Sequence, residues 1–382
     1  MRRGTSPLRR LCSAPPVAAV KRCLSTELPY GEQSPELSYI NRGPRYASGP
    51  STFFRLPHVL FEPSQRGINL NDDEAVVGIV GVPYDGGATN RAGARHGPRG
   101  VREASCDHVR AYNQSTNMSP FEIKNVKVRD FGDCVVQAPW SLESSHAEIH
   151  DFYSQLLTSG VIPLSVGGDH SITLPILKAF HSSHAKTKGK KLSLIHIDAH
   201  ADTGDKYLGS RFHHGAPFRV AVQEGFIDPI RTIQIGIRGS LADPKQWQFS
   251  YENGMTVIPM DHIHSNVRYV KNEAQSYSID DIVAEIKRVV GDGPDDCAYV
   301  SFDIDVLDPA YAPGTGTPEI GGLTTREAQQ LIRGIGDLDL NIVGCDLVEV
   351  SPPFDAAGVT SLAGANLLFE LLCILAKSSR RR

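Results

Sequence analysis

Acidic and histidine side chains follow three apolar runs of this sequence at spacings that suit metal binding. On an extended segment, residues two apart face the same way, so such side chains can converge on one point. The residues concerned are Asp198, His200 and Asp202 after the run 192–197, Asp303 and Asp305 after the run 298–302, and His170, in Gly-Gly-Asp-His, after the run 161–166.

Four carboxylates gathered at one point need compensating positive charge. At an effective dielectric of about 20, one pair of like charges ~4 Å apart costs roughly 4 kcal/mol. Two divalent cations would neutralise all four, and oxygen and imidazole ligands without thiolate favour Mn²⁺ or a similar ion over a structural zinc. Two such ions lower the pKa of water and give a nucleophile at neutral pH. One such triplet alone more often marks a turn or a helix cap, so the prediction depends on the combination.

The elements that would position these residues are apolar, β-rich runs alternating with amphipathic stretches. Most runs are apolar on both faces, as strands covered on both sides must be. The alternation predicts a single three-layer α/β/α domain with an eight-stranded, mainly parallel sheet. In such sheets, ligands bind beyond the carboxyl ends of the strands. Strands are expected at 75–82, 125–130, 161–166, 192–198, 231–237, 255–259, 298–304 and 341–347.

Helices are expected between the strands. The segment 279–290 places its apolar residues on one face, and Gly291 supplies the stop. Ser278 with Asp281, and Thr324 with Glu327, have the spacing of capping boxes. The segment 359–377 is expected to form the last helix.

The N-terminal region differs from the rest of the chain. Residues 1–26 contain six basic residues and no acidic one, which is typical of a mitochondrial transit peptide. Residues 27–70 are rich in Pro, Gly and Ser and are predicted to be an irregular arm, leaving 71–382 as the catalytic domain. Without the leader, 33 basic residues face 43 acidic ones, so the net charge becomes about −10 and nucleic-acid binding is not expected.

Other compositional features narrow the class further. No run approaches the 18 or more apolar residues of a membrane span, so no membrane partner is expected. The seven cysteines form no CxxC pair, which indicates neither a disulfide scaffold nor a zinc knuckle. A reducing compartment such as the mitochondrial matrix is consistent with this pattern.

Three motifs closely resemble the signatures of the arginase/agmatinase, or ureohydrolase, family. They are Gly-Gly-Asp-His-Ser at 167–171, Ile-Asp-Ala-His-Ala-Asp at 197–202 and Ser-Phe-Asp-Ile-Asp-Val-Leu-Asp-Pro at 301–309. The resemblance, which runs from about residue 75 to the C-terminus, implies an arginase-like fold and two Mn²⁺ ions per chain. It implies that one ion binds His170, Asp198, Asp202 and Asp303, and the other Asp198, His200, Asp303 and Asp305.

The resemblance also implies the reaction and its other residues. A small guanidino compound would be cleaved to urea and an amine, with Glu349 pairing with the guanidinium group. Asp202 would accept a proton from the attacking water. His214 would relay a proton near the departing amine, although its neighbour His213 leaves this assignment open. Relatives commonly form trimers or hexamers, so a homo-oligomer is expected.

The preferred substrate is less clearly indicated. Arginases carry an Asn two residues after the last aspartate of their second motif, and here that position is Gly204, which disfavours arginine. The chain is most similar to the agmatinase-like and guanidino acid hydrolase branch. Asn90, Arg91 and Arg219 are candidates to bind a carboxylate at the far end of the substrate. They favour a guanidino acid such as 4-guanidinobutanoate over agmatine. The alternative for the two arginines is that they only hold loops in place.

Three rival functions remain open at this point. A single-zinc deacetylase-like amidohydrolase would share the fold, but both sets of metal ligands are complete. A formiminoglutamase would share the metals and release formamide. A catalytically inactive regulatory homologue would be expected to have lost a ligand, and none is missing.

Overall fold

One parallel sheet organises the protein. The structure, a computed structural model, describes residues 50–379 apart from 62–73, 185–186, 242, 244, 265–275 and 292–295. Its strands are β1 (Ala75–Val82), β2 (Val126–Asp133), β3 (Val161–Gly167), β4 (Leu192–Ile197), β5 (Ile227–Ile237), β6 (Thr256–Pro259), β7 (Cys297–Asp303) and β8 (Asn341–Val348). Every adjacent pair is parallel. The predicted eight-stranded sheet is confirmed, with no antiparallel strand among those described.

The strand order places four distant segments side by side. The order is β2-β1-β3-β8-β7-β4-β5-β6, so β3, β8, β7 and β4 are consecutive neighbours in the middle of the sheet. These are the strands whose carboxyl ends carry the Gly-Gly-Asp-His motif, Glu349, the Asp303 pair and the Asp198 triplet. Because parallel strands end at the same edge, the sheet order alone brings the predicted site together.

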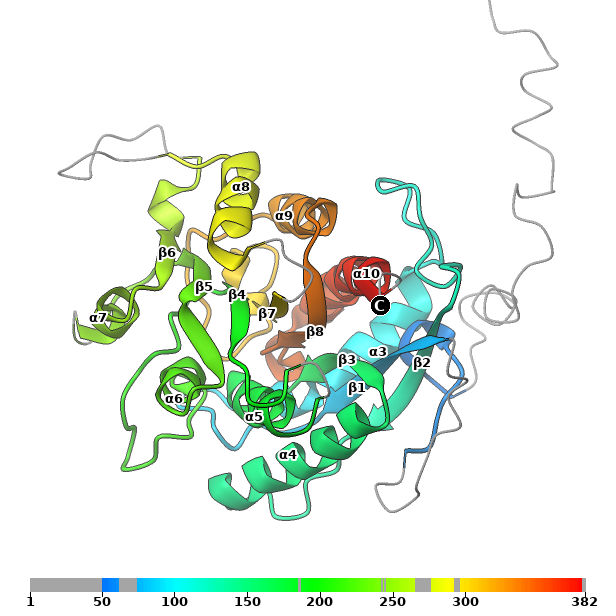
Figure 1. Ribbon diagram of the computed structural model, residues 1–382, viewed down its shortest axis with the longest axis horizontal. Coiled ribbons are helices and arrows are strands. Elements are labelled where there is room, and N and C mark those ends of the chain that lie inside the picture. Colours follow the sequence, from blue (N-terminus) through cyan, green and yellow to red (C-terminus); the bar gives the residue numbers. More distant parts are fainter. Residues whose placement is uncertain are drawn as a thin grey trace, which may run out of the picture.

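Helices cover both faces of the sheet (Figure 1). On one face, α4 (Leu142–Thr158), α5 (Thr173–Ser183) and α6 (Pro217–Gln223) enclose one apolar core. On the other face lies a second core, enclosed by α3 (Gly97–His108), α8 (Ile279–Val290), α9 (Thr325–Asp337) and α10 (Val359–Ser379). The short α7 (Lys245–Glu252) packs beside β6. The predicted three layers are therefore present.

The last helix is unusually apolar. Ala356–Ser379 is, among the described residues, the one helical segment long and apolar enough to cross a membrane, but 83% of its most apolar window is buried inside the protein. A helix surrounded by protein is apolar all round for that reason. Glu370, on this helix, pairs with Arg333 on α9 at 2.5 Å. We therefore describe α10 as a core helix.

Two strands, β5 and β2, differ from the sequence-based expectation by more than one residue at an end. β5 begins at Ile227 rather than at 231, because Ile227 pairs with Leu192 at the start of β4. The register then shifts before Leu194, which accommodates Pro229, a residue with no N–H to donate. β2 extends to Asp133, three residues beyond the predicted end. Both capping boxes, at Ser278 and Thr324, are confirmed.

Part of the N-terminal segment packs against the body. Phe53 is fully buried, and its N–H donates to Asp130 Oδ2 at 2.8 Å. The guanidinium of Arg102 lies 4.2 Å from the centre of the Phe53 ring. The predicted leader, 1–26, lies outside the described residues, as does most of the arm predicted at 27–70.

The cap of α9 offers a test of this local analysis. Thr324 accepts from the N–H of Glu327, whose carboxylate accepts in return from the N–H of Thr324 at 2.8 Å. Thr324→Ala is expected to lower the free energy of unfolding by about 1 kcal/mol, measured by urea denaturation. Thr325→Ala, one residue further on, is the matched control and should cause no such loss. Equal effects of the two changes would show that the cap does not stabilise the helix.

Candidate metal centre and active site

The six predicted metal ligands converge beyond the carboxyl ends of β3, β4 and β7. His170 Nδ1 lies 3.0 Å from Asp198 Oδ2, 3.0 Å from Asp202 Oδ2 and 3.2 Å from Asp303 Oδ2. His200 Nδ1 lies 3.0 Å from Asp305 Oδ2 and 3.5 Å from Asp198 Oδ1. Ligand atoms about 2.1 Å from an octahedral ion lie about 3 Å apart. The spacing therefore fits two neighbouring cation sites, one beside His170 and one beside His200, with Asp198 within reach of both.

The state of His170 supports this conclusion. Its Nε2 lies 2.8 Å from Ser301 Oγ, and that hydroxyl donates to Asp346 Oδ1 at 2.7 Å. Ser301 therefore accepts the proton on Nε2, so a neutral His170 ring presents the lone pair of Nδ1 to Asp198, Asp202 and Asp303. Nδ1 is buried and has no hydrogen-bond partner, although three carboxylates surround it. A lone pair facing carboxylate oxygens is unfavourable unless a cation lies between them.

The burial and mutual repulsion of the carboxylates also favour a bound cation. Burial raises the pKa of Asp303 well above its usual range, and Asp305 and Asp198 raise it further by charge repulsion. Burial likewise raises the pKa of Asp305. Both groups are almost fully buried. Two divalent cations would remove this penalty and keep every carboxylate ionised as a ligand.

A buried polar row lies beneath the ligands. In the register of the sheet, Ser165, Asp346, Ser301, His196 and Gln234 are successive neighbours on β3, β8, β7, β4 and β5. All five residues are fully buried. Hydrogen bonds from this row hold the ligands from below, as supporting residues do in metal sites.

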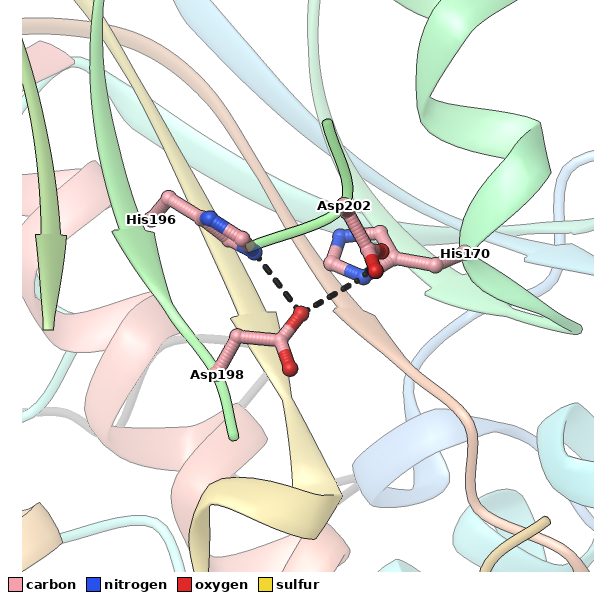
Figure 2. A group of neighbouring side chains, drawn as sticks. All are labelled: His170, His196, Asp198 and Asp202. Carbon is pink, nitrogen blue, oxygen red and sulfur yellow. Dashed lines mark hydrogen bonds and ion pairs between the residues drawn. The ribbon is translucent and has the colours of Figure 1, made fainter. Parts of the chain in front are cut away.

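His196 illustrates this support (Figure 2). Its Nε2 lies 2.7 Å from Asp198 Oδ2, while its Nδ1 lies 3.0 Å from the Gln234 side-chain nitrogen. The Gln234 amide is a donor, so Nδ1 of His196 accepts and Nε2 carries the proton donated to Asp198. His196 therefore orients Asp198, and its Nε2 is not available as a metal ligand.

Glu349 and His214 form the other half of the site. Glu349 Oε1 accepts from the backbone N–H of His170 at 2.9 Å and lies 2.8 Å from His214 Nδ1. Burial lowers the pKa of His214, but the carboxylates of Glu349, Asp169 and Asp202 together outweigh burial and raise it to about 9. By contrast, His213 has no contact with Glu349, and its ring bonds the carbonyl of Asp205 at 2.6 Å. The geometry favours His214 over His213 for the predicted proton relay.

A cavity of about 860 Å³ opens onto these residues. Asn90 and Arg219, two of the predicted substrate contacts, line it. Arg219 donates from Nε to the carbonyl of Thr203 at 2.8 Å and lies over the Phe249 ring. Its terminal nitrogens have no hydrogen-bond partner among the described residues, so they are free to bind an anion.

Arg91 is placed differently from Asn90 and Arg219. Its guanidinium donates to the carbonyls of Thr315, at 2.7 Å, and Gly316, at 3.2 Å, and lies 4.4 Å from the centre of the Phe354 ring. It is not among the cavity-lining residues. This arrangement favours the loop-holding alternative for Arg91.

Several residues of the site were not identified from the sequence. His196, Ser301 and Gln234 lie inside apolar strands, where a polar residue is usually a satisfied core group. Glu319 lines the cavity, and its Oε1 lies 3.9 Å from His200 Nε2. The alternation in Leu-Ser-Leu-Ile-His-Ile-Asp, with His196 two residues before Asp198, was the one available signal, because residues two apart face the same way.

A protein-family model described as Arginase family matches residues 75–373. Guanidinopropionase of Pseudomonas aeruginosa is 48% identical over 340 residues, 88% of this chain and 95% of the relative. Mitochondrial agmatinase of Gallus gallus is 47% identical over 297 residues, 78% of this chain and 80% of the relative. The solved structure of proclavaminate amidino hydrolase from Streptomyces clavuligerus has a TM-score of 0.74 at 36% identity, covering 88% of this chain and all of that one.

Ser301 provides a test of the metal centre that does not depend on turnover. Ser301→Ala removes the acceptor for His170 Nε2 and one donor to Asp346, so His170 is no longer held with Nδ1 toward the carboxylates. We expect Mn²⁺ affinity to fall about 10- to 100-fold, measured by equilibrium titration of the ion. Ser193→Ala, a buried serine on β4 outside the polar row, is the control. Unchanged Mn²⁺ affinity in Ser301→Ala would contradict this role of the row.

Proposed function

Because this chain belongs to the arginase family and is a ureohydrolase-type hydrolase, we propose that it hydrolyses a guanidino acid, such as 4-guanidinobutanoate, to urea and the corresponding amine. The single observation that carries the reaction is the convergence of four carboxylates and two imidazoles beside Glu349. The choice of a guanidino acid over agmatine is a separate step, argued below from the cavity wall.

Two Mn²⁺ ions are the proposed cofactors. His170, Asp198, Asp202 and Asp303 would hold one, and Asp198, His200, Asp303 and Asp305 the other. When bound, the ions supply charge compensation and lower the pKa of water, which makes a nucleophile available at neutral pH. The orphaned Nδ1 of His170 and the repelling carboxylates support their presence.

The residues of the chain would perform the remaining steps. Glu349 is 2% exposed and would hold the guanidinium group by paired hydrogen bonds. Asp202, which lines the cavity, would accept the proton of the attacking water and pass it to the departing nitrogen. His214 would then protonate the amine as it leaves. The acid form of His214 is available at neutral pH because its pKa is about 9.

The far end of the substrate would meet Asn90 and Arg219. A carboxylate suits the free guanidinium nitrogens of Arg219 and the amide of Asn90, both of which line the cavity. The similarity to guanidinopropionase, named for a guanidino acid, agrees with this choice. Asp205 and Asp243 also line the cavity and would suit the ammonium group of agmatine, as the similarity to an agmatinase does. Agmatine is therefore the second candidate.

Cellular location and assembly are part of the proposal. The basic, acid-free segment 1–26 and the likeness to a mitochondrial agmatinase support the mitochondrial matrix. A homo-oligomer, trimer or hexamer, follows from the family resemblance. Among the rival functions, the complete second set of ligands disfavours a single-zinc hydrolase and an inactive homologue. A formiminoglutamase is separated by its product, formamide in place of urea.

Urea release by the Mn²⁺-loaded protein tests the substrate. The panel is 3-guanidinopropanoate, 4-guanidinobutanoate, guanidinoacetate, agmatine and arginine, and we expect a guanidino acid to give the highest kcat/KM. Formation of formamide from a formimino substrate, without urea from any member of the panel, would support the formiminoglutamase instead. Faster turnover of agmatine than of every guanidino acid would contradict the substrate proposal but not the reaction.

Arg219→Gln tests how the carboxylate is recognised. Loss of a charged hydrogen bond costs about 1.5–3 kcal/mol, so KM for the best guanidino acid should rise about 10- to 100-fold. Agmatine, which has no carboxylate, serves as the internal control, and its KM should not rise. A similar rise for both substrates would show that Arg219 shapes the cavity and does not read the anion. Asn90→Ala should give a smaller effect of the same sign.

A further inference from the structure

The backbone N–H and the hydroxyl group of Thr89 both contact the same ring nitrogen of His214, Nε2. The N–H donates to His214 Nε2 at 3.1 Å, and the hydroxyl oxygen lies 2.8 Å from that atom. The other ring nitrogen, Nδ1, lies 2.8 Å from Glu349 Oε1. An ionised carboxylate only accepts, so Nδ1 keeps its proton. Any proton that the ring gains or loses is therefore the one on Nε2.

The two groups of Thr89 suit the two states of the ring. A backbone N–H can only donate, so it requires the lone pair of a neutral ring. The hydroxyl oxygen can accept from the N–H of a charged ring or donate to the lone pair of a neutral one. Both partners are close at hand in a site where His214 is 8% exposed, so water is poorly placed to substitute for either.

The loop that carries Thr89 is held firmly in place. The N–H of Gly87 donates to Asp169 Oδ2 at 2.7 Å, and the carbonyl of Gly87 accepts from the N–H of His214 at 2.9 Å. A Cβ on Gly87 would lie 2.6 Å from Ser171 Oγ, so this close approach requires glycine. Arg91 fixes the far side of the loop through the carbonyls of Thr315 and Gly316. Thr89 therefore cannot drift away from Nε2 when the ring changes charge.

We propose that Thr89 makes Nε2 the atom of His214 from which a proton passes to the departing amine, by supplying a hydrogen-bond partner to both the charged and the neutral ring. This inference rests on the proposed function and adds a positioning residue to it. The N–H bond at Nε2 breaks, an N–H bond forms on the amine nitrogen, and the ring is left neutral. The lone pair that this leaves on Nε2 then accepts a hydrogen bond from the Thr89 amide. Nδ1 keeps its proton and its hydrogen bond to Glu349.

The charges around His214 agree with this direction of transfer. Glu349 touches the ring, Asp169 and Asp202 lie near enough to favour the charged form, and the neighbouring His213 ring is the other titratable group. The pKa of His214 is raised to about 9 against the effect of burial. The ring is therefore charged at neutral pH, and activity that depends on its acid form is lost as pH rises through about 9.

The test compares three changes at one position, with urea release measured on the best substrate of the wild type. Thr89→Val keeps the size and the backbone N–H but removes the acceptor of the charged ring. We expect kcat to fall about 10- to 100-fold with little change in KM, and the basic limb of the pH profile to move to lower pH. Thr89→Ser, which restores only the hydroxyl, should recover most of kcat and the original limb. Thr89→Ala should resemble Thr89→Val.

Other outcomes would overturn the inference. If Thr89→Val had the same kcat and pH profile as the wild type, the hydroxyl would not be needed. Failure of Thr89→Ser to recover activity would show that the methyl group, and so packing, is what matters.

A second measurement is independent of turnover and separates this inference from the proposed function. Neutron diffraction from deuterated crystals of the full chain should show deuterons on both ring nitrogens of His214 at neutral pH. Well above pH 9, the deuteron should remain on Nδ1 and be absent from Nε2. Loss of the deuteron from Nδ1 instead would overturn the inference even in an active enzyme. If the wild type released no urea but showed the expected deuterons on His214, the proposed function would be contradicted and this inference about Nε2 would not.

Discussion

The burial of like charges is the constraint on which the rest of this structure depends. Asp198, Asp202, Asp303 and Asp305 are each less than a tenth exposed and share one small volume. Bound cations would relieve their mutual repulsion, which would couple metal binding to the folding of this edge. The surrounding residues serve this arrangement by fixing how each ligand is oriented before an ion arrives. Substrate chemistry can then use the same charges, because a site that attracts cations also attracts a guanidinium group.

The polar row shows how a parallel sheet can prepare such a site. Residues in register on adjacent parallel strands project on the same face. Asp346, Ser301 and His196 therefore lie side by side across three strands, and no loop residue is needed to bring them together. Each member is fully buried, and leaving one unpaired would cost about 1–3 kcal/mol. The row therefore resists rearrangement. Its hydrogen bonds between Ser301 and His170 and between His196 and Asp198 fix the orientation of the His170 and Asp198 side chains. This is a rigid support of the kind that catalytic groups on strand ends require.

The sequence predicted the parts of this molecule that local chemistry determines. Strand β1 and helix α8 were placed at their observed bounds, because apolar runs and a capping box define them locally. The six ligands could be predicted because residues two apart on a strand end share a face. The polar row could not, because its members are brought together only by the strand order, and that order is not local. The sequence left open whether Arg91 binds the substrate or holds a loop, because the partners it contacts, the carbonyls of Thr315 and Gly316, lie more than 200 residues away.

Two of the residues that would act on the substrate, Asp202 and Glu349, have strained backbones. Asp202 and Glu349 both have left-handed backbones, with φ of 50° and 64°, whereas Asp303 ends β7 at an ordinary φ of −86°. A left-handed conformation costs a non-glycine residue about 1–2 kcal/mol and persists only where neighbours enforce it. Here the N–H of Phe218 bonds the carbonyl of Asp202, and the N–H of Glu349 bonds the carbonyl of Gly168. These bonds hold both strained residues at positions where their side chains line the cavity.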